Sequence, residues 1–288
     1  MKKIKILSIS DHPLSPSGVG TQTRYVLEAA LRTGLFQVIS LGGAIKHNDY
    51  TPTRVEEFGD DWVIVPVDGY GDKDTVRAMI ASHKPDMLWF MTDPRFWAWL
   101  WDIDNEIRKN VPLIYYHVWD NLPYPTFNKR YYDSNDKIVT ISKVTNDIVK
   151  NVAPDVDLSH IPHSVDTDVF KRYSDQDVLS FKKNSVKPRD MDKFVFFWNN
   201  RNARRKQSGT LIWWFKKFAI MSELGINDGQ LLLSENKYPP EVLAMMYNMA
   251  DCTINISDAE GFGLATLESL SCETPIIVNM TGGLQEQV

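Results

Sequence analysis

Residues 4–32 read IKILSISDHPLSPSGVGTQTRYVLEAALR, and this stretch decides the fold. Ile4 to Ile9 are apolar enough for a buried strand, a loop rich in Ser and Pro follows, and Thr21 to Arg32 have the pattern of a helix that Gly34 can end. A strand, a loop and a helix in this order form the repeating unit of a parallel sheet with crossover helices. The stretch therefore predicts an α/β protein.

The same alternation continues toward the middle of the chain. Further strands are expected at 37–41, 62–67, 87–91, 113–117 and 137–141, and helices at 74–82, 95–108 and 142–151. These elements predict a first doubly wound, Rossmann-like domain over residues 1–172.

A polar and charged segment, residues 171–192, then separates this domain from a second one over residues 173–288. In the second domain we expect strands at 194–198, 230–233, 252–256 and 275–278, and helices at 209–221, 240–249 and 262–272. Ligands of open α/β sheets bind outside the carboxyl ends of the strands. Two such sheets suggest that the domains face a cleft.

The composition is that of an ordinary globular protein. Of the 288 residues, 43% are hydrophobic and 24% are charged, which excludes a mainly disordered chain. The net charge of −5 and the pI near 5.7 argue against a nucleic-acid-coating protein, so no nucleic-acid partner is expected.

Targeting signals are also lacking in the sequence. No apolar run approaches the roughly 18 residues of a membrane span, so no transmembrane segment is expected. The basic start, Met1 to Leu7, is interrupted by Lys5 and lacks a small-residue cleavage site, which favours a first strand over a signal peptide. Cys252 and Cys272 do not make a disulfide framework or a metal motif, and a cytoplasmic location is the default.

Three segments could carry chemistry. Ser17 to Thr21 opens a helix after the first strand, so its amides could face an anion, although a plain turn would also need these glycines. Residues 199–206 bring four cations to the expected end of a strand, where they could bind a diphosphate or form a solvated basic loop.

The third segment is the most specific. Residues 260–268 read EGFGLATLE and hold two carboxylates, Glu260 in a loop and Glu268 on the next helix. Carboxylates in these places can accept hydrogen bonds from sugar hydroxyls, and the glycines permit close approach of the backbone to a ligand. Ordinary helix residues, one favoured by the helix dipole and one facing solvent, are the alternative interpretation.

The sequence resembles the retaining glycosyltransferases of family 4, whose B-type fold (GT-B) consists of two Rossmann-like domains. Six pieces carry this resemblance in the order of the family: Ser17-Gly18-Val19-Gly20, Tyr116-His117, residues 161–170, Arg201 with Lys206, residues 260–268, and Thr281-Gly282-Gly283-Leu284.

The resemblance implies transfer of a sugar from a UDP- or GDP-linked donor to an unknown glycan, lipid or protein acceptor, with retention of configuration. The implied catalytic residues are His117, Arg201, Lys206 and Glu260. The implied donor-binding residues are Gly18, Arg201, Lys206, Glu260, Gly261, Phe262, Gly263, Leu264 and Glu268.

Individual roles follow from the same resemblance. The diphosphate would be held by Arg201 and Lys206, and the ribose by Glu268. Glu260 would approach the transferred sugar, His117 would line the cleft near it, and Gly18 would let phosphate and acceptor approach. The first domain would be the acceptor side and the second would bind the donor.

The sequence departs from the family in three places. Asn200 stands where the family usually has Gly before the matched Arg, and Ser17 where a pair of glycines is common. Between residues 218 and 243 about one βα unit is missing, and the final helices of the family do not follow Val288. The second domain is therefore expected to be incomplete.

Neither a metal nor a cofactor is expected. The Asp-x-Asp strings at 102–104, 155–157 and 166–168 lie in contexts that do not suit a metal site. The nucleotide sugar would be a substrate, and contact with a membrane surface stays open.

Two other functions stay open as well. A glycoside hydrolase could use Glu260 and Glu268 as acid and base if the carboxyl groups flank one bond at about 5–9.5 Å. A chain with an incomplete domain could also bind nucleotide sugars or other proteins without turnover.

Overall fold

The computed structural model describes residues 2–221, 231–234 and 236–288. The chain divides into two compact units, Met1–Ser164 and Val165–Val288. This division falls after Ser164, whereas the predicted boundary falls after residue 172. Phe170 explains the difference, because its ring packs with Ala244, Tyr247 and Cys272 in the core of the second unit.

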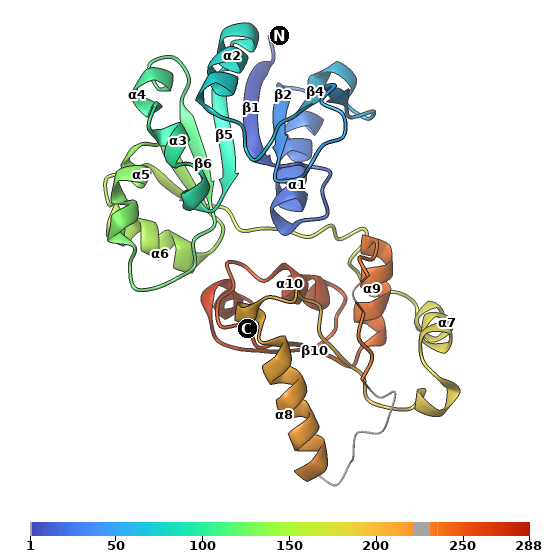
Figure 1. Ribbon diagram of the computed structural model, residues 1–288. Helices are drawn as coiled ribbons and strands as arrows, with labels where there is room; N and C mark the ends of the chain where they lie inside the picture. Colours follow the sequence, from blue (N-terminus) through green and yellow to red (C-terminus); the bar gives the residue numbers. More distant parts are fainter. Residues whose placement is uncertain (1, 222–230, 235) are drawn as a thin grey trace. The chain divides into compact units, whose positions relative to one another are not determined.

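The first unit is built on one sheet (Figure 1). Within residues 2–164 the strand order is β3-β4-β2-β1-β5-β6-β7-β8, and every neighbouring pair is parallel except β3 and β4. The chain order reverses between β1 and β5, as in a doubly wound fold. The strands are β1 (Ile4–Asp11), β2 (Phe36–Gly43), β3 (Thr53–Arg54), β4 (Trp62–Pro66), β5 (Met87–Thr92), β6 (Leu113–His117), β7 (Lys137–Thr140) and β8 (Leu158–His160).

Helices connect these strands. The α-helices are α1 (Gly18–Arg32), α2 (Lys73–His83), α3 (Ala98–Trp101), α4 (Asp104–Ile107), α5 (Lys129–Asp133) and α6 (Lys143–Val152), and the 3-10 turns are η1 (Gly59–Asp61), η2 (Pro94–Phe96) and η3 (Thr126–Asn128). The long helix expected at 95–108 is wrong, because η2, α3 and α4 occupy that stretch.

Helix α1 begins three residues earlier than expected. The Ser17 side chain accepts a hydrogen bond from the Gly20 amide at 2.9 Å and so caps the helix before Gly18. Gly18 and Gly20 therefore belong to the first turn of a helix and not to a free loop.

The core of the first unit consists of apolar and aromatic side chains between the sheet and its helices. Phe90 of β5 stacks on Tyr115 of β6 with ring centroids 4.8 Å apart, and the buried Trp97 and Trp101 pack edge-on against Phe90. Strands buried on both faces are the reason why these runs are continuously apolar.

The second unit has a smaller sheet. Among its described residues the strand order is β11-β10-β9, all parallel. The elements are α7 (Asp175–Ser185), η4 (Pro188–Asp190), β9 (Phe196–Phe197), η5 (Arg204–Lys206), α8 (Ser208–Met221), α9 (Pro240–Met249), β10 (Cys252–Asn255), α10 (Leu264–Ser271), β11 (Ile276–Val278) and η6 (Gly282–Glu286).

The polar segment 171–192 contains the helix α7, which begins after Ser174 because the Ser174 side chain accepts a hydrogen bond from the Asp177 amide. The strand expected at 230–233 is wrong over residues 231–233, which form no strand, and residue 230 lies outside the described residues, as do 222–229 and 235.

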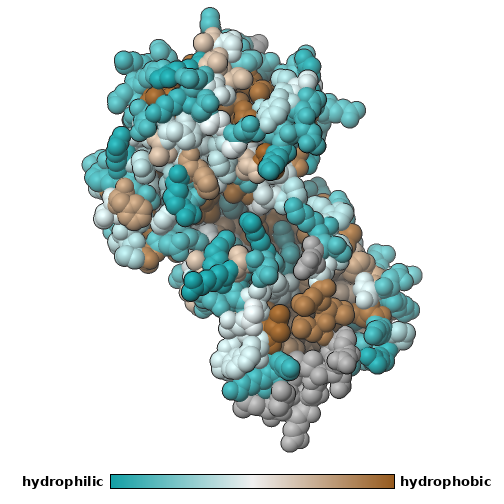
Figure 2. Space-filling model, in the orientation of Figure 1, coloured by the Kyte–Doolittle hydropathy of each residue, from teal (hydrophilic) through white to brown (hydrophobic). Residues whose placement is uncertain are grey.

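Several large apolar side chains of the second unit are exposed, and Figure 2 shows hydrophobic areas on its visible face. The exposed residues include Phe194, Phe196, Trp213, Trp214, Leu231, Leu232, Leu233, Ile277 and Met280. Among the helices that the structure describes, none combines the length and apolarity needed to cross a membrane.

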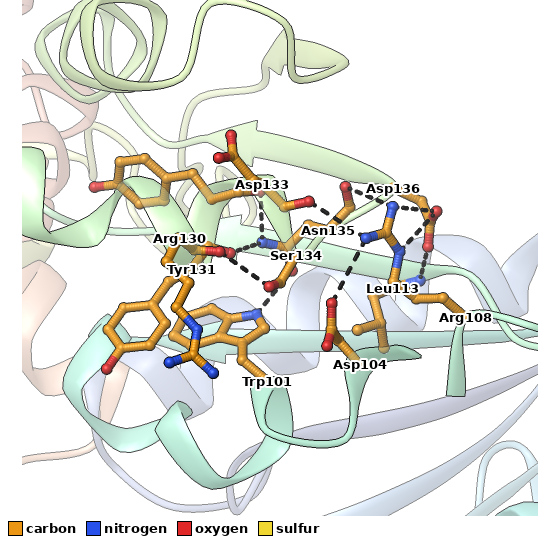
Figure 3. Close-up of polar contacts among 11 residues, drawn as sticks. Trp101, Asp104, Arg108, Leu113, Arg130, Tyr131, Asp133, Ser134, Asn135 and Asp136 are labelled. Atoms are coloured by element: carbon orange, nitrogen blue, oxygen red, sulfur yellow. Dashed lines mark hydrogen bonds and ion pairs between the residues drawn. The ribbon is translucent and has the colours of Figure 1, made fainter. Parts of the chain in front are cut away.

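A polar network closes the amino-terminal edge of β6 and β7 (Figure 3). Asp136 accepts from the Leu113 amide at 2.8 Å and from the Arg108 guanidinium at 3.0 and 3.1 Å. Arg108 also reaches the Asp133 carbonyl at 3.3 Å. Because ligands bind at the opposite, carboxyl ends of the strands, this network stabilises the unit and is not a candidate site.

Asp136→Ala should therefore lower the free energy of unfolding by about 1–2 kcal/mol, because the Leu113 amide and Arg108 lose their acceptor. Thermal and urea unfolding followed by circular dichroism measure the change. Lys129→Ala is the matched control, since it breaks only an exposed pair with Asp133 and should cost under about 0.5 kcal/mol. Equal losses in both variants would contradict this account of the network.

Candidate functional site

The clearest site in the second unit lies where β9 and β10 end. The chain leaves β9, passes Arg201 and enters η5, whose last residue is Lys206. The Lys206 side chain is buried, with 7% of its surface exposed, and it forms an ion pair with Glu260. The sequence spacing alone does not predict this contact, because the two residues are 54 positions apart.

Further bonds join the same two loops. Arg205 Nη1 donates to the Ala259 carbonyl at 2.6 Å and lies 3.7 Å from Glu260 Oε2. The Asp258 amide donates to the Arg205 carbonyl at 2.8 Å, and Gln207 donates to the Asp258 carboxylate. Two cations thus converge on one carboxylate at the carboxyl edge of the sheet.

Glycines bring a third segment against Glu260. The Gly283 amide donates to the Glu260 carbonyl at 2.9 Å. Gly282 has φ +51°, and a Cβ at this residue would overlap with the same carbonyl oxygen. The segment at Thr281 therefore packs directly on the backbone of Glu260 and Gly261 only because both of its glycines lack side chains.

Helix α10 begins directly after this turn. Gly263 is its amino-terminal flanking residue, with φ +93°, and Leu264 is its first residue. Phe262 is buried, with 8% of its surface exposed. The predicted donor-binding residues 260–264 thus form one compact turn at the amino end of α10, where amides and the helix dipole favour negative charge.

Glu268 lies one turn further along α10 and has a different set of partners. Its Oε2 accepts from the Tyr247 hydroxyl at 2.8 Å, and that hydroxyl accepts from Asn199 Nδ2 at 2.9 Å. Burial raises the pKa of Glu268 above its usual range, and burial also raises the pKa of Tyr247. The chain of bonds connects the loop after β9 with α10.

Arg201 differs from Lys206 in being exposed. Among the described residues, its guanidinium is not part of the ion-pair network of Lys206, Arg205 and Glu260, and it lies at the surface of the basic loop. An exposed guanidinium can form a bidentate contact with a phosphate without first losing a partner.

The predicted residues of the first unit are placed differently. Gly18 is the first residue of α1. His117 ends β6 and is fully buried, with Nε2 2.9 Å from the Tyr132 hydroxyl and with no partner for Nδ1 among the described residues. Burial lowers the pKa of His117 to about 3, so the ring is neutral at pH 7. Its catalytic role stays a prediction.

Metal-ligating side chains do not gather in the part of the chain that the structure describes. No group of three or more His, Cys, Asp or Glu residues in that part could hold a metal ion. Cys252 and Cys272 are both buried and unbridged, and burial raises the pKa of Cys272 to about 12, so this thiol is protonated and unreactive at pH 7.

Sequence reasoning missed the residues that support the predicted ones. Arg205 appeared only as one of several cations, and its place beside Glu260 depends on the turn at η5. No sequence pattern indicated a role for Tyr247 or Asn199, because the residues that they join lie on separate elements. Tyr247 precedes Glu268 by 21 positions, a spacing that no local motif covers.

Comparison with known proteins finds a likeness in the second unit. Residues 215–288 match the sequence model of the family described as "Glycosyl transferases group 1". A D-inositol 3-phosphate glycosyltransferase of Thermomonospora curvata is 41% identical over 69 residues, which are 24% of this chain and 16% of that protein. The chain thus covers less than a fifth of that relative's length. The segment that matches the family model, residues 215–288, contains the turn at Glu260 and helix α10.

Solved structures extend the likeness to the fold of the whole chain. Sucrose-phosphate synthase from Thermosynechococcus elongatus matches with a TM-score of 0.78 and 17% identity, over 99% of this chain and 84% of that one. Anabaena Alr3699/HepE, solved with UDP and glucose, matches with a TM-score of 0.69 and 16% identity, over 99% and 83%. The predicted α/β fold of GT-B type is confirmed.

Gly282→Ala should destabilise the second unit by more than about 1 kcal/mol, because alanine at a positive φ is strained and its Cβ meets the Glu260 carbonyl. Gly209→Ala is the matched control. Gly209 lies in α8 with nothing within 4 Å of an added Cβ, so this change should leave stability unchanged or raise it by up to about 1 kcal/mol. Thermal unfolding measures the stability of both variants. A Gly282→Ala variant as stable as the wild type would contradict the tight contact with the Glu260 carbonyl.

The buried histidines predict a pH dependence of stability. Burial lowers the pKa of His117 and of His163 from 6.5 to about 3. Below pH 6.5 the unfolded chain therefore binds more protons than the folded chain. The contribution of these two histidines to the free energy of unfolding is fully present above that pH and is lost as the pH drops toward 3. Urea unfolding between pH 7.5 and about 4.5 measures the slope, and NMR titration of the imidazoles checks its source. Either ring titrating above pH 5 would contradict the assignment.

Proposed function

We propose that this protein is a glycosyltransferase that moves a sugar from a nucleoside diphosphate sugar to an acceptor with retention of configuration. The observation that carries the proposal is the convergence of Lys206 and Arg205 on Glu260, at the amino end of α10. Glu260 and α10 lie within the segment that matches the glycosyl transferases group 1 model, and Arg205 and Lys206 precede that segment. The donor is proposed to be UDP- or GDP-linked.

The first task of such a site is to bind a diphosphate. Lys206 carries a buried positive charge, Arg201 an exposed one, and the amino end of α10 adds partial positive charge from its free amides. A bound diphosphate would share the Lys206 ammonium with Glu260. Charge-assisted hydrogen bonds of this kind are worth about 1.5–3 kcal/mol each, and they strengthen as the leaving group gains charge.

The second task is to orient the nucleoside and the sugar. Glu268 uses one carboxylate oxygen for the Tyr247 hydroxyl. The remaining acceptor capacity of Glu268 suits the vicinal hydroxyls of a ribose. Glu260, held by Lys206 and Arg205, is proposed to face the transferred sugar, with Gly261, Phe262, Gly263 and Leu264 shaping the turn around the donor.

In the proposed reaction the bond between the anomeric carbon and the phosphate oxygen breaks, and its electron pair leaves with the diphosphate. The acceptor oxygen forms the new bond on the same face of the sugar, and its proton passes to the departing phosphate. The main contribution of the protein is then stabilisation of the leaving group by Arg201 and Lys206. No step requires a metal or a cofactor.

The first unit is proposed to be the acceptor side, with Gly18 and His117 as its contributing residues. His117 is buried and neutral, so we propose that it positions its neighbours through the hydrogen bond to Tyr132 and that it transfers no proton. The acceptor is an unidentified glycan, lipid or protein, and the proposed location is the cytoplasm.

A glycoside hydrolase is the weaker alternative. Such an enzyme needs one carboxyl group that is free to protonate a leaving group. Glu260 is instead paired with a buried lysine, and Glu268 is bonded to Tyr247. The separate partners of the two carboxylates support a donor-binding role. A protein that binds nucleotide sugars without turnover is the second alternative, and an activity assay separates it.

Thermal-shift measurements with UDP, GDP and ADP, each with and without Mg²⁺, test the proposal. A nucleotide that binds the folded state raises the melting temperature by mass action. Incubation of the corresponding nucleotide sugars with candidate acceptors, followed by NMR of the anomeric proton, then tests transfer and retention. Absence of any nucleotide effect would count against the proposal, and binding without transfer would favour the non-enzymatic alternative.

Arg201→Met should weaken binding of that nucleotide by at least about tenfold, because one charge-assisted contact to the diphosphate is lost. Its melting temperature without ligand should stay unchanged, since Arg201 is exposed. Arg204→Met removes an exposed charge of the same type three residues away and serves as the matched control. Similar losses in both variants would show that only the charge of the loop matters and would contradict the role of Arg201.

A further inference from the structure

One buried donor beside the candidate site lacks an acceptor. Asn200 follows β9, and its Nδ2 is enclosed without any hydrogen-bond partner among the described residues. Trp198 Nε1, two positions earlier, is unsatisfied within the same described part of the chain. Such groups are rare because a buried N–H without an acceptor loses its bonds to water and gains nothing in return.

The backbone around Asn200 is held on both sides. Asn199 donates to the Tyr247 hydroxyl at 2.9 Å, and Tyr247 is bonded to Glu268. Beyond Arg201, the chain is fixed again by the pairing of Lys206 and Arg205 with Glu260. The unsatisfied amide is therefore part of an ordered loop that both glutamates of the candidate site help to position.

The charges around Asn200 indicate which kind of acceptor its amide lacks. Asn200 directly precedes Arg201 and lies in the loop that ends at Lys206, so the neighbouring charges attract an anion. An amide N–H that bonds to a charged oxygen forms a stronger bond than one to a neutral oxygen. A phosphate oxygen satisfies both the unpaired amide and the positive loop.

We infer that the Asn200 side-chain amide donates a hydrogen bond to a diphosphate oxygen of the bound nucleotide sugar. Asn200 is then a binding residue in addition to Arg201 and Lys206, and it supplies a directed neutral contact where they supply charge. This inference rests on the proposed function, because it needs a nucleoside diphosphate in the loop after β9.

Asn200→Ala gives two opposite signals if the inference holds. Without ligand, the melting temperature should stay the same or rise, because the variant lacks a buried donor that has no partner in the described chain. With ligand, the affinity for the nucleoside diphosphate that binds the wild type, measured by calorimetry, should fall about tenfold. A residue with a purely structural role would lower the melting temperature as well.

Asn202→Ala is the matched control. Asn202 is an exposed residue of the same loop, and its Oδ1 accepts from the Ser208 hydroxyl at 2.7 Å. Its replacement should leave nucleotide affinity within about twofold of the wild type, since no unsatisfied donor is removed. An equal loss of affinity in the two variants would overturn the inference.

Comparison of UDP with UDP-glucose, or of the corresponding pair for GDP or ADP, locates the contact. Equal losses in Asn200→Ala for both ligands support a bond to the diphosphate, whereas a loss confined to the nucleotide sugar would assign the amide to the sugar and overturn the inference. Unchanged affinity for both, or a lowered melting temperature without ligand, would also overturn it. If the wild type binds none of these nucleotides, the proposed function itself fails.

Discussion

The ion pair between Lys206 and Glu260 is the contact on which the candidate site depends. It joins two loops that are 54 positions apart in the sequence, and Arg205 adds a second cation at 3.7 Å. Removing both charges from water is costly, so the pair persists only because the surrounding loops hold it with further hydrogen bonds. The Asp258 amide and the Arg205 carbonyl supply one of these bonds, at 2.8 Å. The positive charge of Lys206 is thereby kept beside the amino end of α10, where an anion can share it.

A second constraint is the close packing that the glycines near the end of the chain permit. Gly282 and Gly283 lie against the backbone of Glu260 and Gly261, and larger residues would push the turn away from Lys206. Further along α10, the Tyr247 hydroxyl donates to Glu268 at 2.8 Å. The two carboxylates of one short motif thus have unrelated partners, and this separation supports different roles for them in binding a donor.

The sequence predicted several of the strands and helices that support this site. The strand at 113–117 and the helix at 240–249 have the expected bounds, because apolar periodicity and a Pro at the helix start are strong local signals. The helix expected at 95–108 was wrong, because the short elements η2, α3 and α4 replace it and Trp97 and Trp101 are buried in the core. Asn200 was noted only as a departure from a family pattern, and nothing in the sequence indicated that its amide lacks a partner.

What the sequence determined by itself was therefore local: the alternation of strands and helices, the cations near Arg201, and two glutamates eight positions apart within one turn and helix. The tertiary structure decided which of these groups meet. Lys206 pairs with Glu260, Tyr247 forms a hydrogen bond with Glu268, and His117 is buried in the core. These placements follow from the way neighbouring parallel strands end at a common edge of the sheet. The physical reason is that periodicity reports the burial of each element, whereas the contacts of a side chain depend on the crossover connections that order the sheet.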